Sequence, residues 1–348
     1  MAERSLTPRL ALAGAALALS LTACARREPS LADYQAPLVV QGANPGLIAN
    51  IQSARNVQQR SVRVVEIFDS AGVQTLAYRE EFLADGAGRF SLQPIEALTP
   101  VDPAWSIRQG VRQGYLARYR DFEIRDTALF ALNWKLTDLS ETSTVAGRPC
   151  SRYFVERKSG SGHTYLIDVD LTTGVPLAYE DRDELGVLAA RMTYESFDET
   201  PDLSGAVWFQ ESVTETELSS GSSASLRQQV GFQVPLPRLI PAGYYLDSTS
   251  SLVVGGGQSW VKLVFSDGVE PLFYLFRPLF DPLQSTAITS GSFPTSVSPQ
   301  TANPSNEIFL YRMGTAGVAQ GTFSPGTLIA VGRLSDATLG DVIESALP

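Results

Sequence analysis

The sequence predicts an α+β protein of two domains in which antiparallel β-structure dominates. A chain of 348 residues has room for about two domains of ordinary size. Most of it consists of short apolar or alternating runs separated by turn residues, a pattern typical of antiparallel strands. Amphipathic helical patterns are few, and one of them lies at the C-terminus. We therefore expect one large curved antiparallel sheet followed by a smaller α+β domain.

Composition and charge exclude several classes of protein. The chain has 37 acidic and 27 basic side chains and a net charge of −10, which argues against a nucleic-acid partner, because binding a polyanion needs a basic face. One His and two Cys leave no ligand set for a His-rich or Cys-cluster metal site. With 18% charged and 44% hydrophobic residues, the chain has the composition of a folded globular protein. We expect no metal and no cofactor.

The N-terminus has the pattern of a secretory signal. Arg4 and Arg9 precede an apolar run from Leu10 to Leu21, which is too short to span a hydrocarbon core of about 30 Å as a helix. The sequence Leu-Thr-Ala-Cys that ends at Cys24 resembles the bacterial lipobox, so residues 1–23 are predicted to be a signal peptide and Cys24 the site of lipid attachment. Two or more acyl chains on this residue would anchor the protein stably to a membrane.

A second interpretation of the same residues is ordinary cleavage after Ala25, because Ala23-Cys24-Ala25 also fits a small-x-small rule. If Cys24 is lipidated, Cys150 is an unpaired thiol, most simply a small buried hydrophobe. If Cys24 is not lipidated, the two cysteines could form a disulfide. Ala25, in place of an Asp, is compatible with sorting to the outer membrane.

Residues 24–36 are polar and without a clear period, and they are predicted to be a lipid-anchored tether that lifts the first domain off the membrane. The first domain is expected over 37–213. Asn44-Pro45 predicts a helix start, and a stripe over 47–57 continues the helix. Another helix is expected around 103–120. The predicted strands of this domain are 62–68, 77–83, 89–92, 151–157, 164–170, 176–182 and 187–197.

These strands in series predict a concave sheet with one inward-facing half. The strand 187–197 alternates, which places Met192 and Tyr194 on one face. Together with Tyr165 and Ile167 they are candidate residues lining a ligand cavity. The alternative is that the same side chains fill the core, and periodicity alone does not separate the two.

Residues 214–228 are rich in Ser and Thr and are predicted to be a linker, followed by the second domain over 229–348. In this domain 260–265 and 272–276 are apolar on both faces and flank Ser266-Asp267-Gly268, which predicts a hairpin covered on both sides. The Ser/Thr/Pro-rich segment 281–306 is predicted to be a mobile insertion. Ser335 is expected to cap a C-terminal amphipathic helix.

No group of residues in the sequence has the pattern of a catalytic site. His163 follows Ser-Gly-Ser-Gly and is expected in a solvent-exposed turn, and Cys150 has no motif of an activated thiol. The glycines 255–257 lack the Lys-Ser/Thr of a phosphate loop. The acidic run 180–184 matches no calcium loop. We therefore expect a binding protein and not an enzyme.

Ordered motifs in both halves resemble the RseB/MucB family of periplasmic regulators of the sigma-E envelope-stress response. In the first half they are 145–149, 165–170 and 173–177 (VAGRP, YLIDVD and TGVPL). In the second half they are 239–244, 263–268 and 329–338 (LIPAGY, LVFSDG and IAVGRLSDAT). The resemblance runs over most of 45–347.

The resemblance implies an N-terminal domain similar to the carriers LolA and LolB, a half-open β-barrel with a helical lid, followed by a smaller α+β domain. It also implies binding to the periplasmic part of a membrane-spanning anti-sigma factor and release when lipid or lipoprotein acyl chains are sensed. Well-known members are soluble, whereas this chain carries a lipobox-like signal, and the segment 281–306 interrupts its second domain.

Two functions follow as expectations. The first is a non-enzymatic envelope-stress regulator that binds an anti-sigma factor and senses lipid. The second is a lipid or lipoprotein carrier or chaperone anchored to the membrane. In both, the protein is expected at the periplasmic face of the cell envelope, anchored through Cys24, with the outer membrane slightly favoured over the inner.

Overall fold

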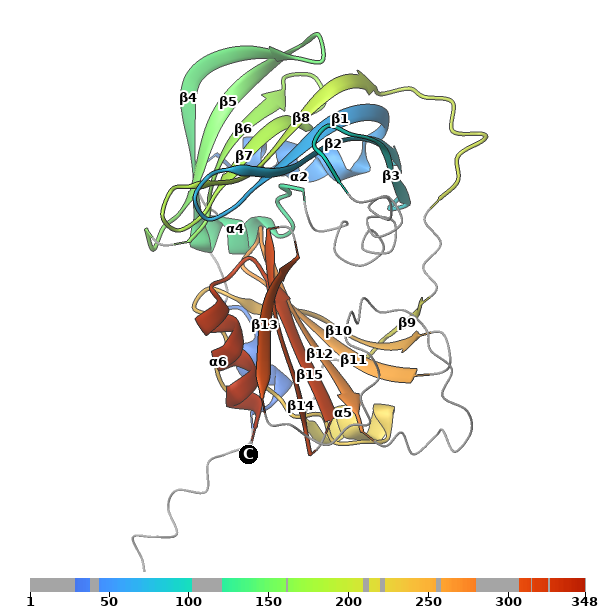
Figure 1. The fold of residues 1–348 in the computed structure, drawn as a ribbon, viewed down its shortest axis with the longest axis vertical. Coiled ribbons are helices and arrows are strands. Elements are labelled where there is room, and N and C mark those ends of the chain that lie inside the picture. Colours follow the sequence, from blue (N-terminus) through green and yellow to red (C-terminus); the bar gives the residue numbers. More distant parts are fainter. Residues whose placement is uncertain are drawn as a thin grey trace, which may run out of the picture.

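The computed structural model describes residues 29–37, 44–101, 121–160, 162–208, 213–219, 223–254, 258–279, 307–313, 315–324 and 326–347. Within these ranges the strands form two antiparallel sheets, one of eight strands and one of seven (Figure 1). The predicted class, α+β with mainly antiparallel β-structure, is confirmed. The predicted signal peptide, Cys24, the helix around 103–120 and the insertion 281–306 lie outside the described residues.

The N-terminal sheet is curved and open. Its strand order is β3-β2-β1-β8-β7-β6-β5-β4, so that β3 and β4 are its two edges and β1 pairs with the distant β8. Figure 1 shows the strands arching over two helices on the concave side. The strands are β1 (Gln58–Phe68), β2 (Gln74–Asp85), β3 (Phe90–Ala97), β4 (Trp134–Val145), β5 (Arg148–Arg157), β6 (Thr164–Asp170), β7 (Pro176–Arg182) and β8 (Leu188–Asp198).

Three hairpins of this sheet are closed by the same Asp-x-x-Gly turn. Asp69, Asp85 and Asp183 each accept two hydrogen bonds on Oδ1, from the backbone N–H groups two and four residues ahead. The carboxylate thus satisfies the turn backbone, as Asp commonly does in turns. Turns are predicted from the sequence at all three positions, and the structure confirms them.

Two described helices lie against the concave face: α2 (Pro45–Ser53), continued by the 3-10 turn η2 (Ala54–Asn56), and α4 (Thr127–Asn133). The predicted start of α2 is confirmed, but Asn44 adopts a left-handed backbone (φ 54°) and its side chain makes no cap hydrogen bond. The sequence analysis does not predict α4. Its cap is Asp126, which accepts a hydrogen bond from the backbone N–H of Leu129 at 2.7 Å.

The C-terminal sheet has the order β13-β14-β15-β12-β11-β10-β9. Its strands are β9 (Val213–Glu217), β10 (Tyr245–Val254), β11 (Gln258–Ser266), β12 (Pro271–Pro278), β13 (Ile308–Met313), β14 (Ala316–Phe323) and β15 (Gly326–Gly332), and its helices are α5 (Ser223–Val230) and α6 (Asp336–Ala346). The predicted hairpin is β11–β12, which has buried side chains on both faces because two hydrophobic clusters sandwich it. The second cluster contains Trp260, Val264 and Phe273.

Two segments that the sequence predicts to be connecting chain are built into the C-terminal domain instead. The predicted linker 214–228 contains β9, which pairs with β10, and α5, whose Leu226 is buried. The predicted tether 24–36 contains the 3-10 helix η1 (Leu31–Tyr34), and both Leu31 and Tyr34 are buried in the core of the C-terminal domain. The prediction fails because each segment contributes only one or two large apolar residues, too few to give a period.

Helix α6 confirms the predicted C-terminal helix. Ser335 is its N-cap, with Oγ accepting a hydrogen bond from the backbone N–H of Thr338, and Leu339, Val342, Ile343 and Ala346 are buried. Among the described residues, none of the helices has the length and apolar character needed to cross a bilayer.

We predict that Ser335→Ala lowers the free energy of unfolding by about 1 kcal/mol, because an N-terminal backbone N–H of α6 loses its acceptor. The control is Asp341→Ala on the exposed side of the same helix, for which we expect a change within about 0.5 kcal/mol. Urea unfolding followed by circular dichroism measures both. Equal destabilisation by the two substitutions would contradict the capping role.

Candidate functional site at the concave face and the domain junction

The apolar half of the concave face lies on β6, β7 and β8. Tyr165 and Ile167 have an exposed fraction of 0%, Met192 of 2% and Tyr194 of 4%. All four predicted cavity-lining residues belong to one cluster of buried side chains, which also contains residues of α2 and α4. The two helices therefore cover this half of the face. Inward alternation along β8 is confirmed.

The other half of the concave face, on β1 and β2, is polar. Arg63 is 1% exposed and pairs through Nε with Glu80 Oε1 at 2.6 Å and through Nη1 with Asp121 Oδ2 at 2.8 Å. The guanidinium also lies over the ring of Phe82, 4.4 Å from its centroid. The hydroxyl of Tyr194 accepts a hydrogen bond from Arg63 at 3.5 Å. Tyr194 thus joins the apolar half of the face to a buried charged cluster.

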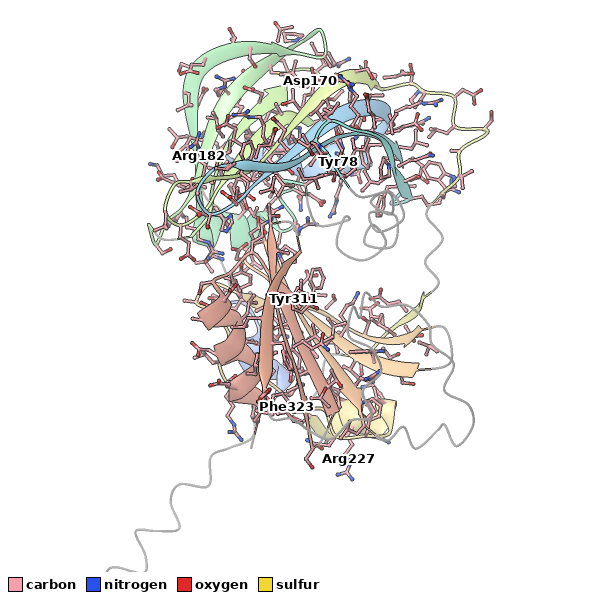
Figure 2. The ribbon with its side chains drawn as sticks, viewed as in Figure 1. Tyr78, Asp170, Arg182, Arg227, Tyr311 and Phe323 are labelled. Carbon is pink, nitrogen blue, oxygen red and sulfur yellow. The ribbon has the colours of Figure 1, made fainter. Side chains whose placement is uncertain are left out.

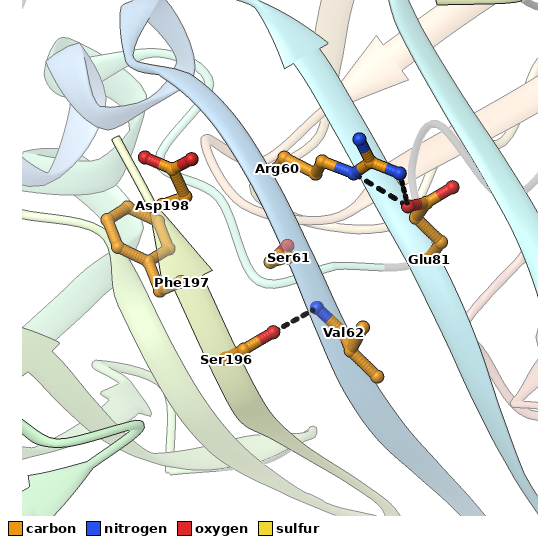
Figure 3. A pocket seen from close by; sticks show the side chains of 7 residues that line it. All are labelled: Arg60, Ser61, Val62, Glu81, Ser196, Phe197 and Asp198. Carbon is orange, nitrogen blue, oxygen red and sulfur yellow. Dashed lines mark hydrogen bonds and ion pairs between the residues drawn. The ribbon is translucent and has the colours of Figure 1, made fainter. Parts of the chain in front are cut away.

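An open pocket of about 230 Å³ lies where β1 and β8 pair (Figure 3). It sits at a bulge, because the register of the two strands shifts between Val62 and Arg63. The hydroxyl of Ser196 accepts a hydrogen bond from the backbone N–H of Val62, and Arg60 pairs with Glu81 at the rim. None of the four predicted cavity residues lines this pocket, which is lined by Arg60, Ser61, Val62, Glu81, Ser196, Phe197 and Asp198.

Buried ion pairs join the two sheets. Arg333, which follows β15, places Nη1 3.0 Å from Glu270 Oε1 and 3.4 Å from Asp181 Oδ2 of β7. The hydroxyl of Tyr165 donates a hydrogen bond to the same Glu270 carboxylate. Asp181 is also bound on its other oxygen by Nδ1 of His163, at 2.6 Å. Tyr165 is therefore both a residue of the concave face and part of the domain junction.

A second set of contacts surrounds the tip of the β11–β12 hairpin. Arg157 of β5 forms an ion pair with Asp267 and donates a hydrogen bond to the hydroxyl of Tyr244 at 3.1 Å. Its guanidinium lies 5.0 Å from the centroid of the Trp134 ring. Asn133, the last residue of α4, donates two hydrogen bonds from Nδ2, to the backbone carbonyls of Gly243 and Asp267. The hairpin tip is thus held by both side-chain and backbone contacts.

The backbones of the two domains meet at Gly268. Its carbonyl accepts a hydrogen bond from the backbone N–H of Arg125 at 2.8 Å, just before α4 begins. Its φ of 102° lies in the left-handed region, and a Cβ at this position would lie 2.3 Å from the backbone nitrogen of Phe130. Only glycine allows the hairpin tip to rest on α4 in this way.

The charges of the junction shift the pKa values of its members. Burial acts to lower the pKa of His163, but the Asp181 carboxylate outweighs it and raises that pKa above its usual value. Burial acts to raise the pKa of Asp181, and Arg333 and His163 hold it below its usual value. The pKa of Tyr165 is raised well above 10, first by burial and then by Glu270. At neutral pH the junction therefore contains ionised Asp181 beside a histidine with raised affinity for a proton.

The predicted exposed position of His163 is wrong: the ring is 8% exposed and bound to Asp181. The local sequence is that of a turn, and the ring is buried because it binds Asp181, which lies 18 residues further along the chain. Cys150 is unpaired and 0% exposed, and burial followed by Asp170 raises the pKa of its thiol to about 11, which makes it a poor nucleophile. Within the described ranges, no group of three or more His, Cys, Asp or Glu side chains could hold a metal ion.

These observations define a class of protein: an open, concave antiparallel sheet covered by helices and joined through buried ion pairs to a second, smaller α+β domain. No protein-family model matches the chain, and no curated protein sequence matches it. MucB gives its name to the family whose motifs this sequence resembles, and three solved structures of it are similar to this chain.

The structure of MucB in complex with MucA(peri) covers 87% of this chain and 96% of its own, with 14% identity and a TM-score of 0.46. The MucA/MucB complex of Pseudomonas aeruginosa has the same coverage and identity and a TM-score of 0.45. A putative outer membrane lipoprotein-sorting protein domain from Vibrio parahaemolyticus covers 45% of this chain and 93% of its own, with 11% identity and a TM-score of 0.22.

We predict that Gly268→Ala destabilises the protein more than Gly186→Ala does. Both glycines have positive φ, so alanine costs roughly 1–2 kcal/mol of backbone strain at either site. At Gly186 a Cβ meets nothing within 4 Å, whereas at Gly268 it meets the backbone of α4. We expect a loss of at least about 3 kcal/mol for Gly268→Ala, measured by urea unfolding. Equal losses would show that the contact with α4 is not tight.

A second prediction concerns pH. Because the folded-state pKa of His163 is raised, the folded protein binds a proton that the unfolded chain releases, and this contribution is complete below the unfolded pKa and is lost as the pH rises through the folded one. The free energy of unfolding should therefore fall in the native chain as the pH rises above about 6.5, the ordinary value of the unfolded histidine, and should change less in His163→Gln. His163 is the one histidine in the sequence, which isolates the effect. Parallel pH profiles would contradict it.

Proposed function

We propose that this protein is a lipid-anchored regulator of the envelope-stress response. It binds the periplasmic part of a membrane-spanning anti-sigma factor and senses lipid or lipoprotein acyl chains through the concave face of its N-terminal sheet. The anchor is Cys24, and the protein lies at the periplasmic face of the envelope, with the outer membrane slightly favoured. It acts by binding and not by catalysis.

One observation carries this proposal: four of the six motifs that resemble the RseB/MucB family contribute residues to the domain junction. The motif 165–170 supplies Tyr165, and the motif 239–244 supplies Gly243 and Tyr244. The motif 263–268 supplies the hairpin tip with Gly268, and 329–338 supplies Arg333. Residues that are far apart in the sequence thus share a structural task, which supports a relationship across both domains.

The junction also supplies a route for ligand control. An acyl chain that entered the apolar half of the concave face would have to displace α2 or α4, which cover it. Helix α4 contacts the hairpin tip through Asn133, and Tyr165 binds Glu270, so that the displacement would disturb the junction. Such a ligand weakens partner binding only if it binds the partner-free form better than the complex.

The charge of the protein favours a basic partner surface. Removal of residues 1–23 takes away Glu3, Arg4 and Arg9, which leaves 25 basic and 36 acidic side chains, a net charge of −11 from the original 27 and 37. An acidic surface increases the rate at which a basic partner segment is encountered, and this effect weakens with salt.

The test is capture of the tagged, full-length protein from native membranes after crosslinking. We expect an inner-membrane protein with a single span and a basic periplasmic segment to be enriched with the native chain and with Gly186→Ala, and to be reduced with Gly268→Ala, which disturbs the junction. If no inner-membrane signalling protein is captured by either the native chain or Gly186→Ala, the proposal is wrong.

A second candidate function is a lipid or lipoprotein carrier or chaperone. The apolar half of the concave face, with its helical cover, favours it. Native mass spectra of the purified protein distinguish the two functions: a carrier should retain lipid without any protein partner and should transfer it to acceptor vesicles. Absence of both bound lipid and transfer would exclude the carrier function.

A further inference from the structure

The chain segment that follows Cys24 is docked on the C-terminal domain. Leu31 is 1% exposed and Tyr34 8%, and both lie in the core cluster that contains Phe265 of β11 and Leu339 of α6. The ring of Tyr34 meets the ring of Phe265 edge-on, with centroids 5.4 Å apart. Its hydroxyl donates a hydrogen bond to the backbone carbonyl of Pro237. This segment is therefore a part of the C-terminal domain and not a free tether.

The docked segment begins beside α5. The carbonyl of Pro29 accepts a hydrogen bond from the hydroxyl of Ser223, the first residue of α5, at 2.8 Å. Five peptide units separate Cys24 from Pro29, and fully extended they span at most roughly 18 Å. If Cys24 carries the lipid, the N-terminus of α5 thus lies within about that distance of the bilayer.

Figure 1 shows α5 at the end of the C-terminal domain that points away from the N-terminal sheet. Figure 2 places Arg227 of α5 and Asp170, the last residue of β6, at opposite ends of the molecule. An anchor at Cys24 therefore holds α5 close to the bilayer, whereas the outer end of the N-terminal sheet lies at the opposite end of the molecule.

The charges near the anchor are compatible with lipid headgroups, although the whole chain is acidic. Helix α5 has Arg227 as its only charged side chain, and between Cys24 and Pro29 the sequence has two basic residues, Arg26 and Arg27, beside the acidic Glu28. Basic residues next to a lipid anchor are attracted by anionic headgroups.

We infer that the docked segment orients the protein on the membrane, with the α5 end of the C-terminal domain against a lipid surface and the N-terminal concave sheet projecting away from it. The inference rests on the proposed anchor at Cys24. In the arrangement predicted from the sequence, residues 24–36 are a tether and the N-terminal domain lies next to the bilayer. In the inferred arrangement, the C-terminal domain lies next to the bilayer instead. In this orientation the concave face is presented to partners and lipid from outside the anchoring membrane.

The test uses the full-length acylated protein, reconstituted in vesicles of phosphatidylethanolamine and phosphatidylglycerol that contain a lipid with a fluorescence-quenching headgroup. Single probes are attached through Gln228→Cys on the exposed side of α5 or through Leu171→Cys, which is 57% exposed in the β6–β7 turn. Acylation consumes the Cys24 thiol and Cys150 is buried, so the introduced thiol is the reactive one. We expect several-fold stronger quenching at position 228 than at position 171.

A variant in which the segment is released provides the matched comparison. Leu31→Ala combined with Tyr34→Ala removes the docking side chains, so that the tether extends to Asn44 and no longer holds α5 near the bilayer. The difference in quenching between positions 228 and 171 should then shrink. Tyr34→Phe keeps the ring on Phe265 and loses only the hydrogen bond to Pro237, and it should retain the difference. If the double variant fails to fold, the comparison of positions 228 and 171 in the native chain still decides.

Equal quenching at the two positions, or stronger quenching at position 171, overturns the inferred orientation while leaving the anchor intact. Mass spectrometry of the N-terminal peptide tests the anchor separately. An unmodified Cys24 and a protein absent from the vesicles would overturn the proposed anchor and the orientation together.

Discussion

The structure depends on the ion pairs buried between the two sheets. Arg333 is shared by Glu270 and Asp181, and Arg157 pairs with Asp267, all at a junction where these side chains are largely excluded from water. Removing a charge from water costs several kcal/mol unless a partner compensates it, so that an arrangement of the domains that buried these groups without their partners would be strongly disfavoured. The ion pairs therefore favour the observed contact between the sheets.

The same junction reaches into the concave face. Tyr165 packs among the buried apolar residues of the N-terminal sheet with its ring, and its hydroxyl binds Glu270 of the other domain. Helix α4 covers the apolar half of the face, and the tip of the β11–β12 hairpin packs against the backbone of the same helix. The same side chain and the same helix therefore take part in both regions, so that the concave face and the domain junction share contacts. In the function proposed above, these shared contacts are the route by which a ligand would affect partner binding.

The N-terminal segment adds a constraint from outside both sheets. Leu31 and Tyr34 complete the C-terminal core although they precede the first domain in sequence. Within the described residues, the chain thus runs from the second domain at 29–37 into the first domain and then returns to complete the second. The core of the C-terminal domain consequently includes contacts with a large sequence separation, such as that between Tyr34 and Pro237, which are 203 residues apart.

The sequence by itself determined the class of fold, the Asp-x-x-Gly turns, the inward face of β8 and the capped helix α6, because each follows from local periodicity or from side chains that bind their own backbone. It also identified Tyr165, Ile167, Met192 and Tyr194 as inward-facing residues. The sequence did not predict the residues that these side chains contact. Glu270, for example, lies 105 residues from Tyr165, and no local pattern encodes such a pair.

Only the tertiary structure decided which polar residues are buried. His163 has the sequence of an exposed turn, yet its ring is buried against the Asp181 carboxylate, which also pairs with Arg333. The segments 24–36 and 214–228 have the composition of connecting chain, yet each contributes one or two apolar side chains to a core built by other strands. In each case the side chain is buried because residues distant in sequence stabilise it, either by compensating its charge or by providing an apolar core. The local sequence does not contain this information.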